Sequence, residues 1–305
     1  MKKVDGELPA IDHLKIKAPA TSANVGSGFD VFGMALEIPY DIIELEPNDS
    51  LEIVIRGKNA EEISTEPMKN TAGFVASELG CKVKITIHKG IVAGSGLGSS
   101  AAPAAGTAFG INKMFELGFS LEELVWIAAR GEIVSAGVEH ADNVAATLFG
   151  GFTVVHHKRV VAITPVGIGI VAVLPNFAVN TRDARLILPK AVSLRDLVFN
   201  VGCASMMVIG MLRNDIKLIG ESMHNPVIEP VRARLIPGYL DVRNSALRAG
   251  ATGVTISGSG PAMIAICALD EREEVASAMI DAFKENGINS EAYMTTVGQG
   301  LEILA

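Results

Sequence analysis

A glycine-rich segment between two differently patterned stretches constrains this chain more than any other feature. Residues 91–102 read IVAGSGLGSSAA. Before them, apolar and polar residues alternate over 82–88, which predicts a half-buried strand. After them, alanine-rich sequence predicts a helix over 99–117. Glycines let main-chain amides approach an anion closely, and a helix N-terminus adds its positive dipole end, so the segment is typical of a phosphate-binding loop.

Two better-known phosphate-binding loops fit this segment less well. A P-loop requires GxxxxGK[ST], and no lysine follows these glycines. Gly96, Gly98 and Ala101 formally match the dinucleotide fingerprint, but the predicted strand ends near His88, several residues too early. The acidic residue about 20 positions later would be Glu116, which lies in helical sequence. A glycine- and serine-rich connection without any ligand is the remaining alternative.

Two further segments carry glycines beside polar residues: 17–30 (KAPATSANVGSGFD) and 257–261 (SGSGP). Taken alone, the first is explained by a turn, because Asn and Asp beside Gly are common turn formers. The second lies between predicted strands at 254–257 and 262–267, so a hairpin explains it as well as a ligand does.

A carboxylate on an apolar stretch suggests a metal site. Glu132 is surrounded by Ala, Ile and Val, and His140, Asp142 and Asn143 follow it. Burial of such a carboxylate is costly unless it meets a cation. Beside a phosphate loop, magnesium is the natural partner, because hard cations bind carboxylate and hydroxyl oxygens. The alternative is a solvated surface position for Glu132.

The remaining patterns predict a mixed α+β or α/β chain. Ser120 and Glu123 form a capping box, Ser193 opens a long apolar helix to 212, and a glycine follows a helix predicted over 270–286. Further strands are predicted at 51–56, 152–156 and 169–174. The best candidate for a domain boundary is the turn around 156–159, which divides the chain into 1–157 and 158–305.

Composition excludes some classes of function. A net charge of −8 argues against a nucleic-acid partner. The apolar stretches at 90–112, 160–175 and 249–269 are too short or too rich in Gly, Ser and Pro to predict a membrane span. No signal peptide is visible, and three widely spaced cysteines suggest neither disulfides nor a zinc site. We therefore expect a cytoplasmic protein.

In their order along the chain, the motifs KAPATSANVGSGFD, GSGLGSSAA and ISGSGPA resemble those of the GHMP kinases. Within that superfamily, the homoserine kinases are the most similar, through SANVGSGFD, GEIVSAGVEHADNVA, NTRDAR at 180–185 and EPVRARLIPG at 229–238. The resemblance implies an α+β, two-domain GHMP kinase fold: a left-over-right mixed α/β N-terminal domain that binds ATP and a ferredoxin-like C-terminal domain. It also implies transfer of the ATP γ-phosphoryl to the side-chain hydroxyl of L-homoserine, on the route to threonine, and a homodimer.

The resemblance also implies roles for individual residues. Ser100 and Glu132 match the hydroxyl and carboxylate that hold Mg²⁺, and Asn70 matches an asparagine that reaches the adenine. The loop that would wrap the triphosphate comprises Val92, Ala93, Gly94, Ser95, Gly96, Leu97, Gly98, Ser99, Ser100 and Ala101. The positions that would contact the amino acid are Asn24, Asp30, His140, Asn143, Thr181, Arg185 and Arg232, with Arg234 as an alternative to Arg232.

An amino-acid acceptor agrees with these charges. Homoserine presents an ammonium, which suits Asp30, and a carboxylate, which suits a guanidinium fork from Arg185 or Arg232. For catalysis, Asp142 and Asn143 are both candidates. We expect Asn143 to orient the hydroxyl and no side chain to act as base. Another small-molecule kinase, of shikimate or mevalonate type, and a non-catalytic nucleotide sensor remain alternatives.

Overall fold

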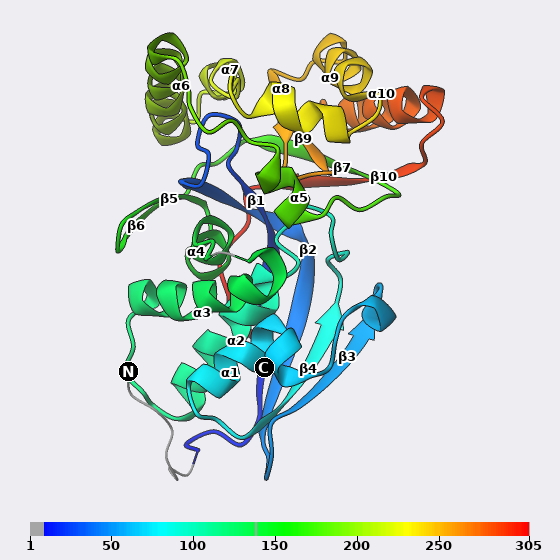
Figure 1. Cartoon of the computed structure of the whole chain (residues 1–305). Coiled ribbons are helices and arrows are strands. Elements are labelled where there is room, and N and C mark those ends of the chain that lie inside the picture. The colour runs from blue at the N-terminus through cyan, green and yellow to red at the C-terminus, as the bar shows by residue number, and fades with distance from the viewer. Residues whose placement is uncertain (1–8, 138, 305) are drawn as a thin grey trace.

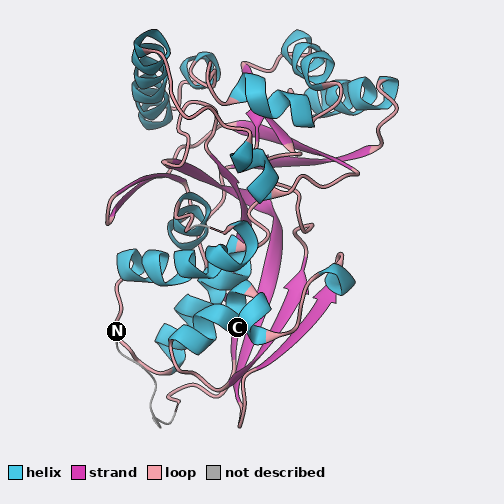
Figure 2. Ribbon diagram, in the orientation of Figure 1, coloured by secondary structure: helices cyan, strands magenta, loops and turns pink. Residues whose placement is uncertain are grey.

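The computed structural model describes residues 9–137 and 139–304 of the 305-residue chain. It contains two β-sheets, one above the other in Figure 1, and each is covered by helices. In the lower, N-terminal half the helices gather on one side of the sheet (Figure 2). In the upper half most helices lie on the side of the sheet that faces away from the lower half. The fold is thus the two-domain, mixed α/β architecture that was expected.

Seven strands form the lower sheet. They are β1 (Leu14–Ala23), β2 (Phe32–Pro47), β3 (Glu52–Gly57), β4 (Val83–Lys89), β5 (Phe152–His156), β6 (Arg159–Ile163) and β11 (Glu302–Leu304). Their order is β11-β1-β2-β4-β3, with β5 paired to β2 and β6 to β5. The alternation predicted for β4 is confirmed, because Val83, Ile85 and Ile87 are all buried. The long β2, which no sequence pattern indicated, pairs with β4 over one part of its length and with β5 over another.

The helices that cover this sheet are α1 (Thr71–Glu78), α2 (Ala101–Met114), α3 (Leu121–Ala136) and α4 (Asp142–Phe149), and the short 3₁₀ helices are η1 (Ala60–Glu62) and η2 (Pro67–Lys69). The small residues of α2 are explained by its close approach to the sheet. A Cβ atom at Gly110 would lie 2.2 Å from the Leu45 side chain. The predicted capping box of Ser120 and Glu123 is present at the start of α3.

The upper sheet consists of β7 (Gly169–Pro175), β8 (Gly253–Ile256), β9 (Met263–Cys267) and β10 (Ser290–Thr296). All its pairs are antiparallel, in the order β10-β7-β9-β8. Helices connect β7 to β8 and β9 to β10, and β8 and β9 form a hairpin. These connections and the strand order are those of a ferredoxin-like domain. Its helices are α5 (Thr181–Leu186), α6 (Leu194–Arg213), α7 (Ile216–Glu221), α8 (Glu229–Arg232), η3 (Ala233–Leu235), α9 (Tyr239–Arg248) and α10 (Arg272–Glu285).

The turn at 156–159 joins β5 and β6, which pair antiparallel within the lower sheet. A boundary between residues 157 and 158 would therefore separate two paired strands. The upper sheet begins only with β7, so we propose that the division lies between Ile163 and Gly169. The C-terminal β11 returns to the lower sheet and pairs with β1.

Helix α6 is apolar although little of it is buried. Met207 and Met211 are buried, whereas Leu194, Val198 and Leu212 are 75%, 64% and 62% exposed. Among the described residues it is the one helix long and apolar enough to cross a membrane, and 17% of its most apolar window is buried. It was not among the stretches considered from the sequence. A single helix of this kind is weak evidence for a membrane span, and its exposed face needs another explanation.

Candidate active site

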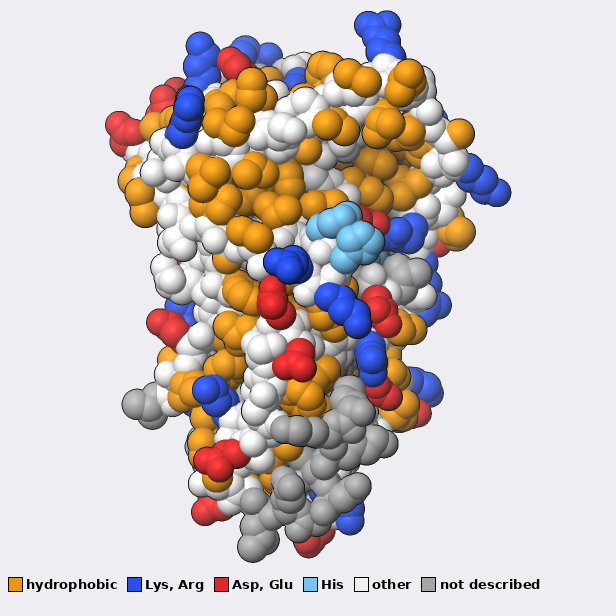
Figure 3. Space-filling view, turned by 90° about the vertical axis from the view of Figure 1, so that its left-hand side faces the viewer, with side chains coloured by type: hydrophobic (Ala, Val, Ile, Leu, Met, Phe, Trp, Pro, Cys, Tyr) orange, Lys and Arg blue, Asp and Glu red, His pale blue; other side chains and the backbone are white. Residues whose placement is uncertain are grey.

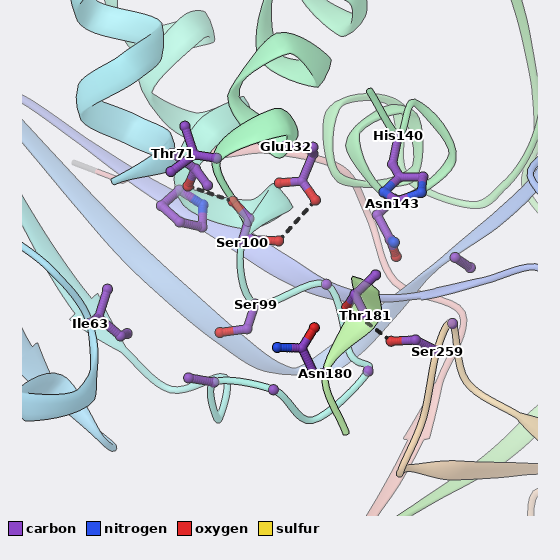
Figure 4. Close-up of a pocket in the computed structure, with 18 of the residues that line it drawn as sticks. Ile63, Thr71, Ser99, Ser100, Glu132, His140, Asn143, Asn180, Thr181 and Ser259 are labelled. Atoms are coloured by element: carbon purple, nitrogen blue, oxygen red, sulfur yellow. Dashed lines mark hydrogen bonds between the residues drawn. The ribbon is translucent and has the colours of Figure 1, made fainter. Parts of the chain in front are cut away.

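A cavity of about 480 Å³ lies where the two halves meet, and both contribute to its wall. Figure 4 shows Ser99 and Ser100 of the glycine-rich loop facing it, together with Thr181 and Ser259 from the upper half. The predicted site residues that line it are Asn24, Asp30, Asn70, Ala93, Gly94, Gly96, Gly98, Ser99, Ser100, Glu132, His140, Asp142, Asn143, Thr181 and Arg232. Residues predicted from separate motifs thus converge on one cavity.

The glycine-rich loop has the backbone of an anion-binding loop. Gly94, Gly96 and Gly98 have φ angles of 68°, 82° and 71°, a left-handed region that strongly favours glycine. The loop leads into the first turn of α2, where Ser100 makes no side-chain capping hydrogen bond. The first amides of a helix have no partner within the helix, and Ser100, which precedes α2, lines the cavity. The loop can therefore bind phosphate through its main chain.

The three glycine motifs contact one another directly. The Asn24 side chain donates a hydrogen bond to the Gly258 carbonyl at 3.0 Å, and the Ser257 hydroxyl donates to the Gly96 carbonyl at 2.7 Å. A Cβ atom at Gly96 would lie 2.6 Å from the Ser257 carbonyl oxygen, so no larger residue fits there. The SGSGP turn joins β8 to β9 as a hairpin, as predicted, and it also supports the phosphate-binding loop.

Ser100 and Glu132 form a hydroxyl–carboxylate pair. The Ser100 Oγ donates to Glu132 Oε2 at 2.9 Å (Figure 4). Glu132 is 4% exposed, so the alternative of a solvated surface position is wrong. Burial raises the pKa of Glu132 to about 7, and the nearby Asp142 contributes. Two hard oxygen donors beside a phosphate loop suit magnesium, which completes its shell with phosphate oxygens and water. The part of the chain that the structure describes holds no group of three or more Asp, Glu, His or Cys side chains arranged to bind a metal ion by themselves.

Asn143 is oriented by Thr21, which lies within the segment 17–30 but was assigned no role from the sequence. The Thr21 Oγ1 donates to Asn143 Oδ1 at 2.8 Å. This bond leaves the amide nitrogen of Asn143 as the group available to the cavity. The neighbouring Asp142 is 3% exposed and accepts from the Asn143 main-chain amide at 2.8 Å. Burial, assisted by the charge of Asp30, raises the pKa of Asp142 to about 7.

A charged cluster forms another part of the site. Arg185 Nη2 lies 2.9 and 2.8 Å from the two oxygens of Asp30 and 2.7 Å from His140 Nε2. From the sequence, Asp30 and Arg185 were candidates for opposite ends of an amino acid, whereas in the structure they are ion-paired. Burial, followed by the charge of Arg185, lowers the pKa of His140. Asp30 itself has a left-handed φ of 58°, a strained conformation for a non-glycine residue.

Arg232 reaches the cavity, whereas Arg234 does not line it. Arg232 is 5% exposed, donates to the Gly258 carbonyl at 2.6 Å, and lies over the Phe29 ring at 5.2 Å. Burial lowers its pKa to about 10. Its Nε has no hydrogen-bond partner among the described residues. Arg232 thus places a guanidinium group at the wall of the cavity, and a guanidinium can bind a carboxylate.

Asn70 has a structural role that the sequence analysis missed. Its Oδ1 accepts from the amides of Ala72 and Gly73 at the start of α1, and its Nδ2 donates to the Ser64 carbonyl at 2.9 Å. Such side-chain caps satisfy amides that have no partner within the helix. Asn70 lines the cavity, but most of its hydrogen-bonding capacity is used by the main chain.

Some predicted residues do not line the cavity: Val92, Ser95, Leu97, Ala101 and Arg185. Ser95, Leu97 and Ala101 are buried members of the loop, and Arg185 contacts the site through Asp30 and His140. The residues that the sequence analysis missed include Thr21, Asn180 and Ser259. Ser259 lies 3.2 Å from Thr181, hydroxyl to hydroxyl, and Asn180 caps α5. All three lie within motifs that the sequence analysis quoted, which was the available signal.

Comparison with known proteins agrees with this geometry. Residues 66–151 match the GHMP kinases N terminal domain, and residues 207–289 match the GHMP kinases C terminal domain. Homoserine kinases from Methanocella arvoryzae and Haloarcula marismortui are 52% and 49% identical to this chain, over 96% and 95% of it and 98% and 99% of their own lengths. The crystal structure of homoserine kinase from Cytophaga hutchinsonii aligns with a TM-score of 0.89 at 36% identity, covering 97% of this chain and 98% of that one. The chain therefore belongs to the GHMP kinase family and, within it, to the homoserine kinases.

Proposed function

We propose that this protein transfers the γ-phosphoryl group of ATP to the side-chain hydroxyl of L-homoserine, in threonine biosynthesis. One observation carries the proposal: a phosphate-binding loop with a buried hydroxyl–carboxylate pair shares a single cavity with a cluster of charged side chains. The first half of that arrangement suits a nucleotide, and the second suits a small zwitterion. The names of the relatives provide independent support.

Ser100 and Glu132 would hold the magnesium ion. When bound, magnesium neutralises charge on the phosphate oxygens. Without a cation, a buried carboxylate is driven toward its protonated form, which agrees with the raised pKa of Glu132. The hydrogen bond from Ser100 Oγ to Glu132 Oε2 keeps these two oxygens beside each other.

Amino-acid recognition would use Arg232 and the ion pair of Asp30 with Arg185. Arg232 lines the cavity and would offer its guanidinium group to the substrate carboxylate. Asp30 is 39% exposed in its side chain and can accept from an ammonium while it stays paired with Arg185. Asn24, Thr181 and His140 complete this part of the cavity wall. Shikimate and mevalonate lack an α-ammonium beside the carboxylate, so they would give Asp30 no ammonium to bind.

The transfer step requires alignment and charge neutralisation more than covalent chemistry, because phosphoryl transfer passes through a loose transition state. The loop amides and the N-terminus of α2 would stabilise charge on the phosphate oxygens. Asn143, held by Thr21, would orient the acceptor hydroxyl with its amide nitrogen. We propose that no side chain acts as base and that Asp142 supports the first turn of α4 through the Asn143 amide.

The proposal is tested by a coupled ADP-release assay with homoserine, shikimate and mevalonate in parallel, each with MgATP. We expect turnover with homoserine at least about a hundredfold above the other two, because a site built to bind a polar substrate group discriminates strongly against analogues that lack it. Equal or better turnover of shikimate or mevalonate would refute the substrate assignment. Binding of MgATP without any phosphoryl transfer would instead indicate a nucleotide sensor.

We also propose a cytoplasmic homodimer in which the exposed face of α6 is the subunit interface. Figure 3 shows hydrophobic side chains gathered over the upper part of the face on which α6 lies. Exposed apolar residues there include Leu194, Leu197, Val198, Phe199 and Val201. Contiguous apolar patches of this kind are uncommon on monomers. Sedimentation of V198E should show a monomer if the helix forms the interface, and a dimer unaffected by V198E would refute this placement.

A further inference from the structure

A buried ion pair lies directly beneath the phosphate-binding loop and belongs to none of the three glycine motifs. Lys89, the last residue of β4, contacts Asp41 of β2. Their side chains are 1% and 0% exposed. Lys89 also lines the active-site cavity. The pair is therefore buried, and it adjoins the part of the cavity that the glycine-rich loop lines.

The hydrogen bonds of this pair reach both ends of the loop. Asp41 Oδ1 accepts from the main-chain amides of Gly90 and Ile91, each at 2.9 Å, where the loop begins. Lys89 Nζ donates to Asp41 Oδ2 and, at 2.8 Å, to the carbonyl of Ser99, where the loop ends. A third bond, from the Ser99 hydroxyl to the Ile91 carbonyl at 3.1 Å, closes the same loop. The pair thus joins residues 90 and 91, where the loop begins, to Ser99 near its end.

Such a pair is a poor device for stability alone. Burial raises the pKa of Asp41 and lowers that of Lys89, and only their mutual attraction and hydrogen bonds oppose these shifts. Apolar residues of similar volume often replace a buried ion pair without loss of stability. What apolar residues cannot replace here is the set of bonds to three main-chain groups of the loop. Ser100, which binds Glu132, is the next residue after the one that Lys89 holds.

We propose that Asp41 and Lys89 are a positioning pair, which fixes the two ends of the phosphate-binding loop so that its amides and the Ser100 hydroxyl face the nucleotide phosphates. This inference rests on the proposed use of the loop for ATP. Loss of either side chain releases one end of the loop and displaces the phosphate-binding groups. We expect this loss to weaken nucleotide binding and not amino-acid binding, because the groups that would bind the amino acid are held by other contacts.

The test compares wild type with K89M, D41L and the double variant D41L/K89M. We expect each to raise both the KM for ATP and the Kd for MgATP about tenfold or more, because small displacements of binding groups are costly. The KM for homoserine should stay within about twofold, since the charged cluster is untouched. K84M is the matched control: Lys84 pairs with Glu46 on the same two strands, at the surface, and its loss should change neither constant.

The double variant separates positioning from stability. We expect D41L/K89M to regain thermal stability relative to the single variants, because no unpaired charge stays buried, while its affinity for MgATP stays low. Recovery of affinity together with stability would refute the proposal, as would wild-type affinity in K89M. MgATP binding is measured by calorimetry without acceptor. A wild type that binds MgATP but does not phosphorylate homoserine would therefore overturn only the proposed function, whereas one that binds no MgATP would overturn both.

Discussion

Replacement of Thr21 by valine tests the proposed role of Asn143 most directly. Thr21 is completely buried, and its hydroxyl donates to Asn143 Oδ1 at 2.8 Å. Valine has nearly the same shape, so T21V removes the donor and leaves the packing in place. A buried hydrogen bond of this kind contributes about 1 to 1.5 kcal/mol. If all of it serves to hold the amide in its catalytic orientation, kcat should fall about 5- to 10-fold.

The assay is steady-state ADP release at saturating MgATP, with homoserine varied, alongside thermal unfolding. T147V is the matched control, because the buried Thr147 hydroxyl also bonds to residue 143, but to its main-chain carbonyl at 3.0 Å. We expect T147V to lose similar stability and little kcat. In a double-mutant cycle, T21V should have little further effect in N143A. An unchanged kcat in T21V, or an equal fall in T147V, would refute the reasoning.

Three further predictions follow from buried charges in the site. Burial raises the pKa of Glu132 from its ordinary 4.5 to about 7, so the unfolded chain releases this proton at a lower pH than the folded protein does. The free energy of unfolding of the ligand-free protein should therefore fall by about 3 kcal/mol as the pH rises from about 4.5 to 7. In denaturant titrations, E132Q should abolish this contribution. D142N should retain kcat within about tenfold, since a general base is worth about 100-fold or more, and a larger loss with fold and binding intact would reveal a base. R232M should raise the KM for homoserine about 10- to 100-fold, and R234M should leave it unchanged, because of these two arginines only Arg232 lines the cavity. Equal effects of the two variants on this KM would contradict the assignment of Arg232 to the substrate carboxylate.

Local patterns were sufficient for much of the fold. The alternation over 82–88, the capping box at Ser120 and the helix that begins after Ser193 all depend on side chains close in sequence, and each is present in the structure. The long β2 was missed because its partners β1, β4 and β5 come from distant parts of the chain. The boundary predicted at 156–159 falls on a turn between two paired strands of the lower sheet, because a turn within a domain and a turn between domains have the same local composition.

The chain alone determined that a phosphate-binding loop precedes a helix, and its motifs identified the family. These properties reside in contiguous residues, in which glycine and helix-forming side chains set the backbone directly. Only the tertiary structure decided that Thr21 orients Asn143, that Asp30 pairs with Arg185 and that Lys89 holds Ser99. Each of these contacts joins residues from different elements, and their hydrogen bonds depend on distances of about 3 Å that no local pattern encodes.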